Sequence, residues 1–108
     1  GDVALSYIAN KVRQGDEDGM VGLTEMDGIT VLQLKQEING SEYVTYIYYR
    51  DGKLWELFTD TESGLGVNDG YEILECDEVA MSMDGELLSV STSGDGGGRI
   101  WLSLRSGG

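Results

Sequence analysis

The sequence predicts an α+β fold in which one short N-terminal helix packs on an antiparallel β meander of about seven or eight strands. Apolar residues recur with helical spacing only near the start of the chain. Beyond Gly15 the apolar period changes to two, and Asp-Gly or Asn-Gly pairs interrupt it repeatedly. A length of 108 residues allows one modest core, so residues 1–108 are predicted to form a single domain.

The predicted helix covers residues 3–14. Its apolar residues fall at i, i+3, i+4 and i+7 and form one stripe: Leu5, Ile8, Ala9 and Val12. Lys11 and Arg13 suit the negative end of the helix dipole, and Gly15 is a plausible stop. A helix of about twelve residues is marginal by itself in water, so we expect it to pack on the β region, residues 20–105.

Six Asp-Gly pairs and one Asn-Gly pair predict tight turns, because such pairs supply the positive φ that two-residue hairpins require. The Asp-Gly pairs are at 18–19, 27–28, 51–52, 69–70, 84–85 and 95–96, and the Asn-Gly pair is at 39–40. Two-residue turns at 27–28, 39–40 and 51–52 predict the facing pairs Leu23–Leu32, Val21–Leu34, Leu34–Thr45, Leu32–Ile47, Tyr49–Leu54 and Thr45–Phe58.

These three turns place one apolar set on a single sheet face: Val21, Leu23, Leu32, Leu34, Ile47, Tyr49, Leu54 and Phe58. Glu56 is the misfit on that face. The opposite face is amphipathic and carries Val31, Gln33, Lys35, Val44, Tyr46, Tyr48, Trp55 and Leu57. The helix should cover one face, which leaves the other for the second half of the sheet, a partner or water.

The C-terminal half of the chain is also predicted to contain an Asp-Gly hairpin. A turn at Asp84-Gly85 predicts that Met81 faces Leu88 and Val79 faces Val90. A short strand is expected over 71–76. After the loop 93–98, a last strand alternates Ile100, Leu102 and Leu104 with Trp101 and Ser103. Residues 60–70 form the longest predicted loop, which separates a four-strand half from a half of three or four strands.

The charge is strongly acidic, with 7 basic and 20 acidic residues and a formal net charge of −13. Such a chain repels nucleic-acid phosphates and anionic membrane surfaces, and the basic residues are scattered singly. Eleven acids and no base lie between Lys53 and Arg99. The composition therefore predicts no nucleic-acid partner.

No catalytic apparatus is visible, and we predict neither an enzyme nor a bound cofactor. The chain has no histidine, so its single thiol, Cys76, lacks the usual general base and metal co-ligands. A small, buried apolar role in a strand is expected for Cys76. No two carboxylates stand out as a hydrolytic pair among the twenty acids.

No metal site is predicted. Calcium is the metal that acidic loops suit best, because hard cations need clustered oxygens. Its candidate ligands are Asp60, Glu62 and Asp69 in the acidic loop 60–70. Neither this loop nor Asp16-Glu17-Asp18-Gly19 has EF-hand spacing, and the glycine-rich stretch 94–98 lacks the repetition of a calcium β-roll. The stretch 94–98 also lacks the following helix and lysine of a phosphate-binding loop.

Aromatic residues crowd the predicted hairpin 43–58, namely Tyr43, Tyr46, Tyr48, Tyr49 and Trp55. Cross-strand aromatic pairs usually stabilise the sheet that carries them. The other interpretation is a contact surface for protein or sugar, since both faces of the hairpin carry large side chains.

The stretch Leu5-Ser6-Tyr7-Ile8-Ala9-Asn10-Lys11-Val12-Arg13-Gln14, followed by an acidic turn and a meander, resembles the soluble part of pseudopilin-like, competence-type membrane proteins of Gram-positive bacteria. The segments 46–54 and 102–107 are similar to that uncharacterised set as well. The resemblance implies a pilin-like fold, an N-terminal membrane helix that would precede Asp2, and no catalytic residues.

It further implies a structural or assembly subunit whose domain is extracytoplasmic, at the cell surface or membrane-anchored. Its partners would be other subunits of a pilus-like or secretion-type assembly, and it would meet the membrane only through that preceding helix. The alternative is an independent protein- or calcium-binding module that uses the aromatic hairpin 43–58 or the acidic loop 60–70.

Overall fold

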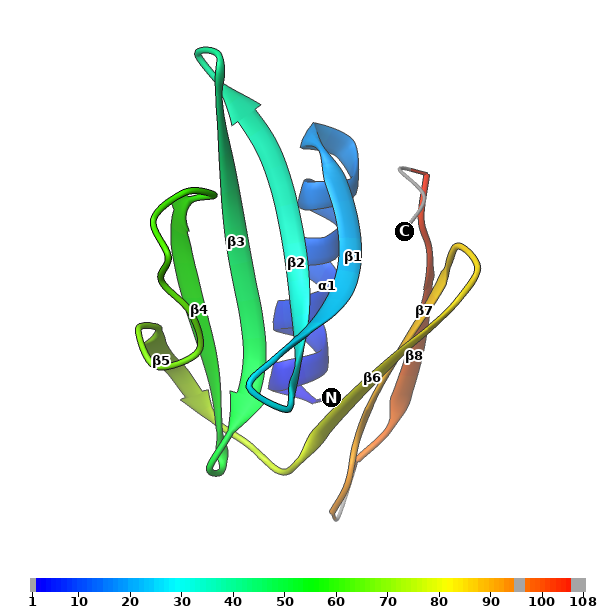
Figure 1. The fold of residues 1–108 in the computed structure, drawn as a ribbon. Coiled ribbons are helices and arrows are strands. Elements are labelled where there is room, and N and C mark those ends of the chain that lie inside the picture. Colours follow the sequence, from blue (N-terminus) through cyan, green and yellow to red (C-terminus); the bar gives the residue numbers. More distant parts are fainter. Residues whose placement is uncertain (1, 95–96, 106–108) are drawn as a thin grey trace.

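One helix and eight antiparallel strands make up the fold in the computed structural model, which describes residues 2–94 and 97–105 (Figure 1). The helix is α1 (Val3–Asp18). A five-stranded sheet has the order β1-β2-β3-β4-β5, and a three-stranded sheet has the order β6-β7-β8. The strands are β1 (Met20–Met26), β2 (Ile29–Ile38), β3 (Ser41–Arg50), β4 (Lys53–Asp60), β5 (Tyr71–Glu75), β6 (Val79–Asp84), β7 (Leu87–Thr92) and β8 (Arg99–Ser103). The α+β fold with a β meander is thus confirmed.

The helix is longer than the sequence predicts. Asp2 caps its first turn by accepting a hydrogen bond from the Leu5 backbone N–H at 3.1 Å, and Gly19, not Gly15, ends it. Gly15 stays helical because it faces the sheet: a Cβ there would lie 3.1 Å from Leu34 Cδ2. A Cβ on Gly19 would lie 1.9 Å from the Lys35 carbonyl oxygen, so only glycine allows β2 to pass this closely.

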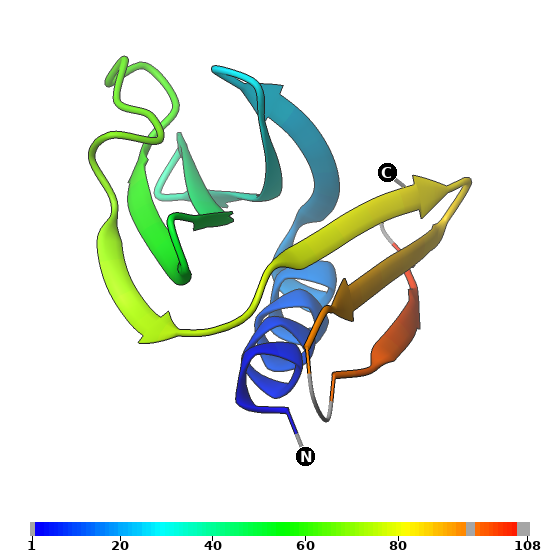
Figure 2. The same cartoon turned by 90° about the horizontal axis from the view of Figure 1, so that it is seen from below.

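The core lies around α1, which sits between the two sheets (Figure 2). The predicted stripe of Leu5, Ile8, Ala9 and Val12 is buried. Both sheets contribute to the same cluster: Val21, Leu32, Leu34, Ile47 and Leu54 from the first, and Val79, Leu88, Val90 and Leu104 from the second or its end. Both ends of the helix also bond to the second sheet. The Thr92 hydroxyl donates to the Asp2 carboxylate at 2.9 Å, and the Arg105 backbone N–H donates to Asp16 at 2.8 Å.

The first three hairpins have the predicted register. Asp27, Asn39 and Asp51 have φ between 51° and 52°, and the glycine after each also has positive φ, as type I′ turns require. All six predicted facing pairs are found, from Leu23–Leu32 to Thr45–Phe58.

The hairpin at 84–85 is displaced from the prediction. Asp84 pairs with Leu87, so Gly85 and Glu86 form the turn, and Met81 faces Val90 while Val79 faces Thr92. Only Gly85 has positive φ there, which is the pattern of a type II′ turn with glycine first. The shift is an even number of residues, so each side chain keeps its predicted face.

The other Asp-Gly pairs are not two-residue hairpins. Asp18-Gly19 ends the helix, Asp69-Gly70 lies in the loop before β5, and residues 95–96 lie outside the described residues. The strand expected over 71–76 ends at Glu75. Because β5 pairs with β4, the two sheets separate after β5 and not at the loop 60–70.

The outer face of the first sheet is covered by the chain itself. Val67, in the loop that joins β4 to β5, is buried against Val31 and Tyr48, with Met26, Ile29, Tyr46 and Trp55 around them. The Tyr48 hydroxyl donates to the Val67 carbonyl at 2.8 Å. Neither the second sheet nor a partner is needed at this position, because a folded-over loop fills it.

Candidate functional site

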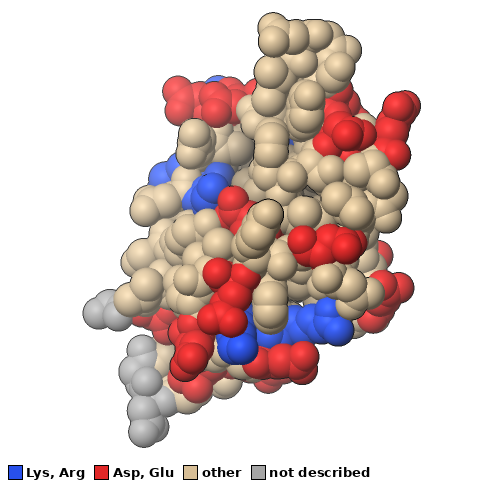
Figure 3. All heavy atoms as spheres, turned by 90° about the vertical axis from the view of Figure 1, so that its left-hand side faces the viewer, with Lys and Arg blue, Asp and Glu red and all other residues tan. Residues whose placement is uncertain are grey.

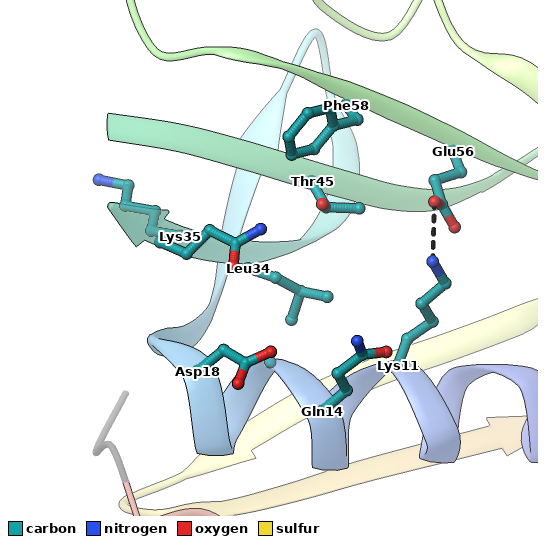
Figure 4. A pocket seen from close by; sticks show the side chains of 10 residues that line it. Lys11, Gln14, Asp18, Leu34, Lys35, Thr45, Glu56 and Phe58 are labelled. Carbon is teal, nitrogen blue, oxygen red and sulfur yellow. Dashed lines mark hydrogen bonds and ion pairs between the residues drawn. The ribbon is translucent and has the colours of Figure 1, made fainter. Parts of the chain in front are cut away.

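A groove of about 260 Å³ lies between the C-terminal half of α1 and the inner face of the first sheet (Figure 4). Lys11, Gln14 and Asp18 project from the helix at i, i+3 and i+7 and form one wall. The opposite side is lined by Leu34 on β2, Thr45 on β3 and Phe58 on β4, with Lys35, Gln36 and Glu56 at its borders. The groove thus combines an apolar floor with charged edges.

Phe58 corrects the sequence prediction, which places it with the buried inner face. The side chain is 50% exposed, because α1 packs mainly over β1 and β2 and does not cover this end of β4. Phe58 instead stacks on Tyr43, with ring centroids 5.4 Å apart and planes 9° from parallel. A half-exposed aromatic ring remains available at the groove.

Glu56, the misfit on the inner face, has two partners on the helix. The Tyr7 hydroxyl donates to Glu56 Oε1, and Lys11 Nζ donates to Oε2 at 3.0 Å. The Glu56 side chain is 17% exposed and that of Lys11 is 33% exposed. Burial of Tyr7, its hydrogen bond to Glu56 and the charge of that carboxylate all raise the pKa of the Tyr7 phenol.

The contacts of this cluster join α1 to β4. The raised pKa keeps the Tyr7 phenol protonated at neutral pH, so it is a donor and not a base. Both oxygens of Glu56 are engaged. The Thr45 hydroxyl makes no hydrogen bond to Glu56 among the described residues, so the groove offers no bonded nucleophile–base pair.

The aromatic residues of hairpin 43–58 mostly stabilise the sheet. Tyr48 is fully buried, and Trp55 Nε1 donates to the Arg50 carbonyl at 2.9 Å. Tyr43 is used in the stack with Phe58. Of this hairpin, Phe58 is the large apolar side chain left substantially exposed.

A family model described as a domain of unknown function (DUF4860) matches residues 1–95. The chain belongs to this family. No curated protein and no solved structure matches it. Nearly the whole chain therefore corresponds to one domain of an uncharacterised family.

Two of the three calcium candidates of the DUF4860 domain, Asp60 and Asp69, accept hydrogen bonds from the backbone of their own loop. Asp60 Oδ1 accepts a hydrogen bond from the Glu62 backbone N–H at 2.9 Å, and Asp69 Oδ2 accepts one from Gly66 N–H at 2.8 Å. Within residues 2–94 and 97–105, no group of three or more acidic, Cys or His side chains is arranged to hold a metal ion. Asp60, Glu62 and Asp69 are therefore not brought together as a site.

Cys76 follows β5 and is half-buried against the core of the DUF4860 domain. Burial, followed by the negative charges of Asp2 and Asp77, raises the pKa of its thiol. The thiol form is thereby favoured over the reactive thiolate. This environment agrees with the apolar role expected for Cys76, although the residue lies just beyond the strand.

The acidic residues do not gather into one patch on the side of β4 and β5. Figure 3 shows Asp and Glu side chains distributed over this face, with Lys and Arg between them. Some of the basic side chains form ion pairs with acidic ones. Lys11 pairs with Glu56, and Lys53 pairs with Glu72 at 3.1 Å. No helix in the described part of the DUF4860 domain is long and apolar enough to cross a membrane.

Sequence reasoning missed the groove. Its walls come from α1, β2, β3 and β4, which are up to 47 residues apart between Lys11 and Phe58. Among the groove residues, only Glu56 was unusual in the sequence, because a carboxylate among apolar inward-facing residues needs a hydrogen-bond or charge partner. Nothing in the sequence pointed to Tyr7 and Lys11 as those partners.

Proposed function

We propose that this DUF4860 domain is a non-enzymatic structural or assembly subunit, the extracytoplasmic domain of a pseudopilin-like, membrane-anchored protein. The position of α1 supports the proposal most directly. The helix is the first element, both sheets pack on it, and its N-terminal end emerges at the periphery of the molecule (Figures 1 and 2). A membrane segment that preceded Asp2 would hold the whole domain through its central element.

Two further features support a structural role. Asp2 caps the helix through Leu5 and joins its start to the second sheet through Thr92, so a load on the N-terminus would be transmitted to the core. Among the described residues, the groove between α1 and the first sheet has Leu34 and Phe58 in its lining and no bonded nucleophile–base pair. The partners proposed are other subunits of a pilus-like or secretion-type assembly.

The complete gene provides the first test. Codons ahead of Asp2 are expected to encode a prepilin-peptidase site followed by about 20 apolar residues. An upstream sequence without such an apolar segment would refute the membrane-anchored role. With the segment present, fractionation of the native cell is expected to place the full-length protein in the membrane, with the domain open to added protease on intact cells once the cell wall is removed. Protection from that protease would contradict the extracytoplasmic placement.

A second candidate function is an independent protein-binding module, which the half-exposed Phe58 ring in the groove favours. A photo-crosslinking residue at position 58 of the full-length protein is expected to give a discrete adduct in the native cell. The same residue at position 87, which is 40% exposed and lies on β7, outside the elements that line the groove, serves as the control. Equal labelling from both positions would remove the groove as a binding site.

A further inference from the structure

The outer strands of the two sheets differ in how well they are protected against pairing. The first sheet ends at β1 and β5, and the second ends at β6 and β8. Strands β1 and β6 contact each other.

Strand β5 carries Glu72 and Glu75 and meets β4 through a register shift. Strand β8, Arg-Ile-Trp-Leu-Ser, carries a single charge, Arg99 at its first residue, and its pairing with β7 is regular. Charges and bulges protect natural edge strands, so β8 is the open edge of the described fold.

The hydrogen-bond pattern shows which groups of β8 are free. Thr92 N–H donates to the Gly98 carbonyl at 2.9 Å, and Leu104 N–H donates to the Glu86 carbonyl at 2.8 Å. The register between these two pairs is unbroken. Because alternate residues of an antiparallel strand bond to the same neighbour, the backbone groups of residues 99, 101 and 103 point away from β7.

Arg105 is next in that outward series, and its N–H is taken by the Asp16 carboxylate at 2.8 and 3.1 Å. At residues 99, 101 and 103, no backbone hydrogen bond joins this outer edge to another part of the described chain. The side chains of Arg99, Trp101 and Ser103 are exposed. The free edge is therefore three residues long with Trp101 at its centre.

We propose that β8 pairs antiparallel with β8 of a second copy of this chain, across a twofold axis at Trp101. Each Trp101 then exchanges both backbone hydrogen bonds with the partner's Trp101, and Arg99 lies opposite the partner's Ser103. The two three-stranded sheets become one continuous sheet.

The side chains fit this register. Trp101 is 59% exposed, and directly opposed aromatic side chains stabilise a strand pair. On the other face, Ile100 lies opposite the partner's Leu102. There a groove of about 380 Å³ lies between α1 and Ile100 of β8. Leu5, Ser6 and Ala9 line it, with Asp2, Asn10 and Arg13 also in its lining. That space receives the partner's apolar side chain beside Ile100.

Charge also favours this edge over the others. The chain carries −13, yet β8 has a base and no acid, and Arg105 follows it. The register keeps the two Arg99 side chains at opposite ends of the paired strands. Each lies toward the end of the partner's β8, where Asp16 binds the Arg105 backbone. The remaining like-charge repulsion is long-range, so added salt should strengthen the dimer. Pairing through β8 does not depend on membrane anchoring, so the two proposals can fail separately.

Sedimentation equilibrium over a range of protein concentrations tests the pairing. The wild-type chain is expected to show a monomer–dimer equilibrium that shifts toward dimer between low and physiological salt. Ser103→Pro removes an outward N–H and leaves the ladder to β7 intact, because proline is tolerated at an open edge. The two lost hydrogen bonds should weaken the dimer roughly tenfold or more. Ser103→Thr keeps the N–H and should dimerise like wild type, and circular dichroism checks that all three chains are folded.

A cysteine cross-link tests the register in a Cys76→Ala background. Residues that exchange both hydrogen bonds have Cα atoms about 5.5 Å apart, within disulfide reach. Trp101→Cys is therefore expected to form a disulfide dimer with oxidised glutathione, which accepts the two electrons. Ser103→Cys, at a position that is also exposed but lies four residues from its own copy along the pair, should stay uncross-linked. A chain that is monomeric at millimolar concentration, or a dimer unaffected by Ser103→Pro, would overturn the proposal. Equal cross-linking at both positions would do the same.

Discussion

Tyr7, Lys11 and Glu56 show how single residues connect the helix to the first sheet. Glu56 lies in an otherwise apolar register, and a buried carboxylate without partners would be strongly destabilising. Tyr7 and Lys11, one helical turn apart, supply a donor to each of its oxygens. The polar contact is therefore part of the packing, and its pH dependence can be measured.

Alkaline pH should destabilise the domain through Tyr7. Its pKa is raised in the folded chain, whereas in the unfolded chain it is about 10. The stabilisation is fully present below that value and is lost as pH rises toward the folded pKa, because only the unfolded state releases the proton. Urea unfolding between about pH 8 and pH 11 should show a falling free energy of unfolding.

Tyr7→Phe provides the control for that slope. The variant should be less stable by about 1 kcal/mol at neutral pH, since Glu56 loses one donor. Its stability should fall less steeply above about pH 10 than that of wild type, and Tyr48, whose pKa burial also raises, keeps part of the slope. An unchanged slope in Tyr7→Phe would show that the Tyr7 phenol is not responsible.

At the scale of elements, the turns decide the strand register and differ in what they demand of each residue. Type I′ turns place an aspartate or asparagine in the left-handed region, whereas the turn at Gly85 needs only its glycine there. The same dipeptide, Asp-Gly, therefore has different roles at 27–28 and 84–85.

Alanine substitution should distinguish the two aspartates, both of which are exposed. Asp27→Ala forces an alanine to φ near 52° and should cost about 1 kcal/mol of folding free energy. Asp84→Ala should change stability by less than about 0.5 kcal/mol. Chemical denaturation of both variants is the measurement, and equal losses would contradict the different turn types.

The loop between β4 and β5 is held by one apolar anchor. Val67 is 4% exposed, and Val67→Ala removes two buried methyl groups. We expect a loss of about 1.5 kcal/mol in the free energy of unfolding. Leu65→Ala, at a position 43% exposed in the same loop, should be nearly neutral. Similar effects at both positions would mean that Val67 does not anchor the loop.

At the scale of the whole molecule, self-repulsion opposes folding. The net charge of −13 is spread over both sheets and the loops, with few ion pairs among the described residues. Repulsion between exposed charges falls when salt shortens its range. Stability should thus depend on ionic strength more than on any single acid.

The melting temperature should rise as sodium chloride increases from about 0.01 to 0.15 M, where the screening length falls from about 30 to 8 Å. Measurements at two protein concentrations separate this effect from self-association, which also stabilises the fold. A melting temperature that stays constant or falls would show that the acids are balanced locally.

The helical stripe and the register of the first three hairpins follow from the sequence alone. Both depend on local spacing and on turn residues whose backbone conformation is nearly fixed by their chemistry. The folded chain was needed to show that Gly15 continues the helix against Leu34 and that β5 returns to the first sheet. It was also needed to show that Val67 packs on the outer face of that sheet. It also decided which edge stays open and where the groove lies. These features depend on contacts between residues distant along the chain, whose partners no local pattern specifies.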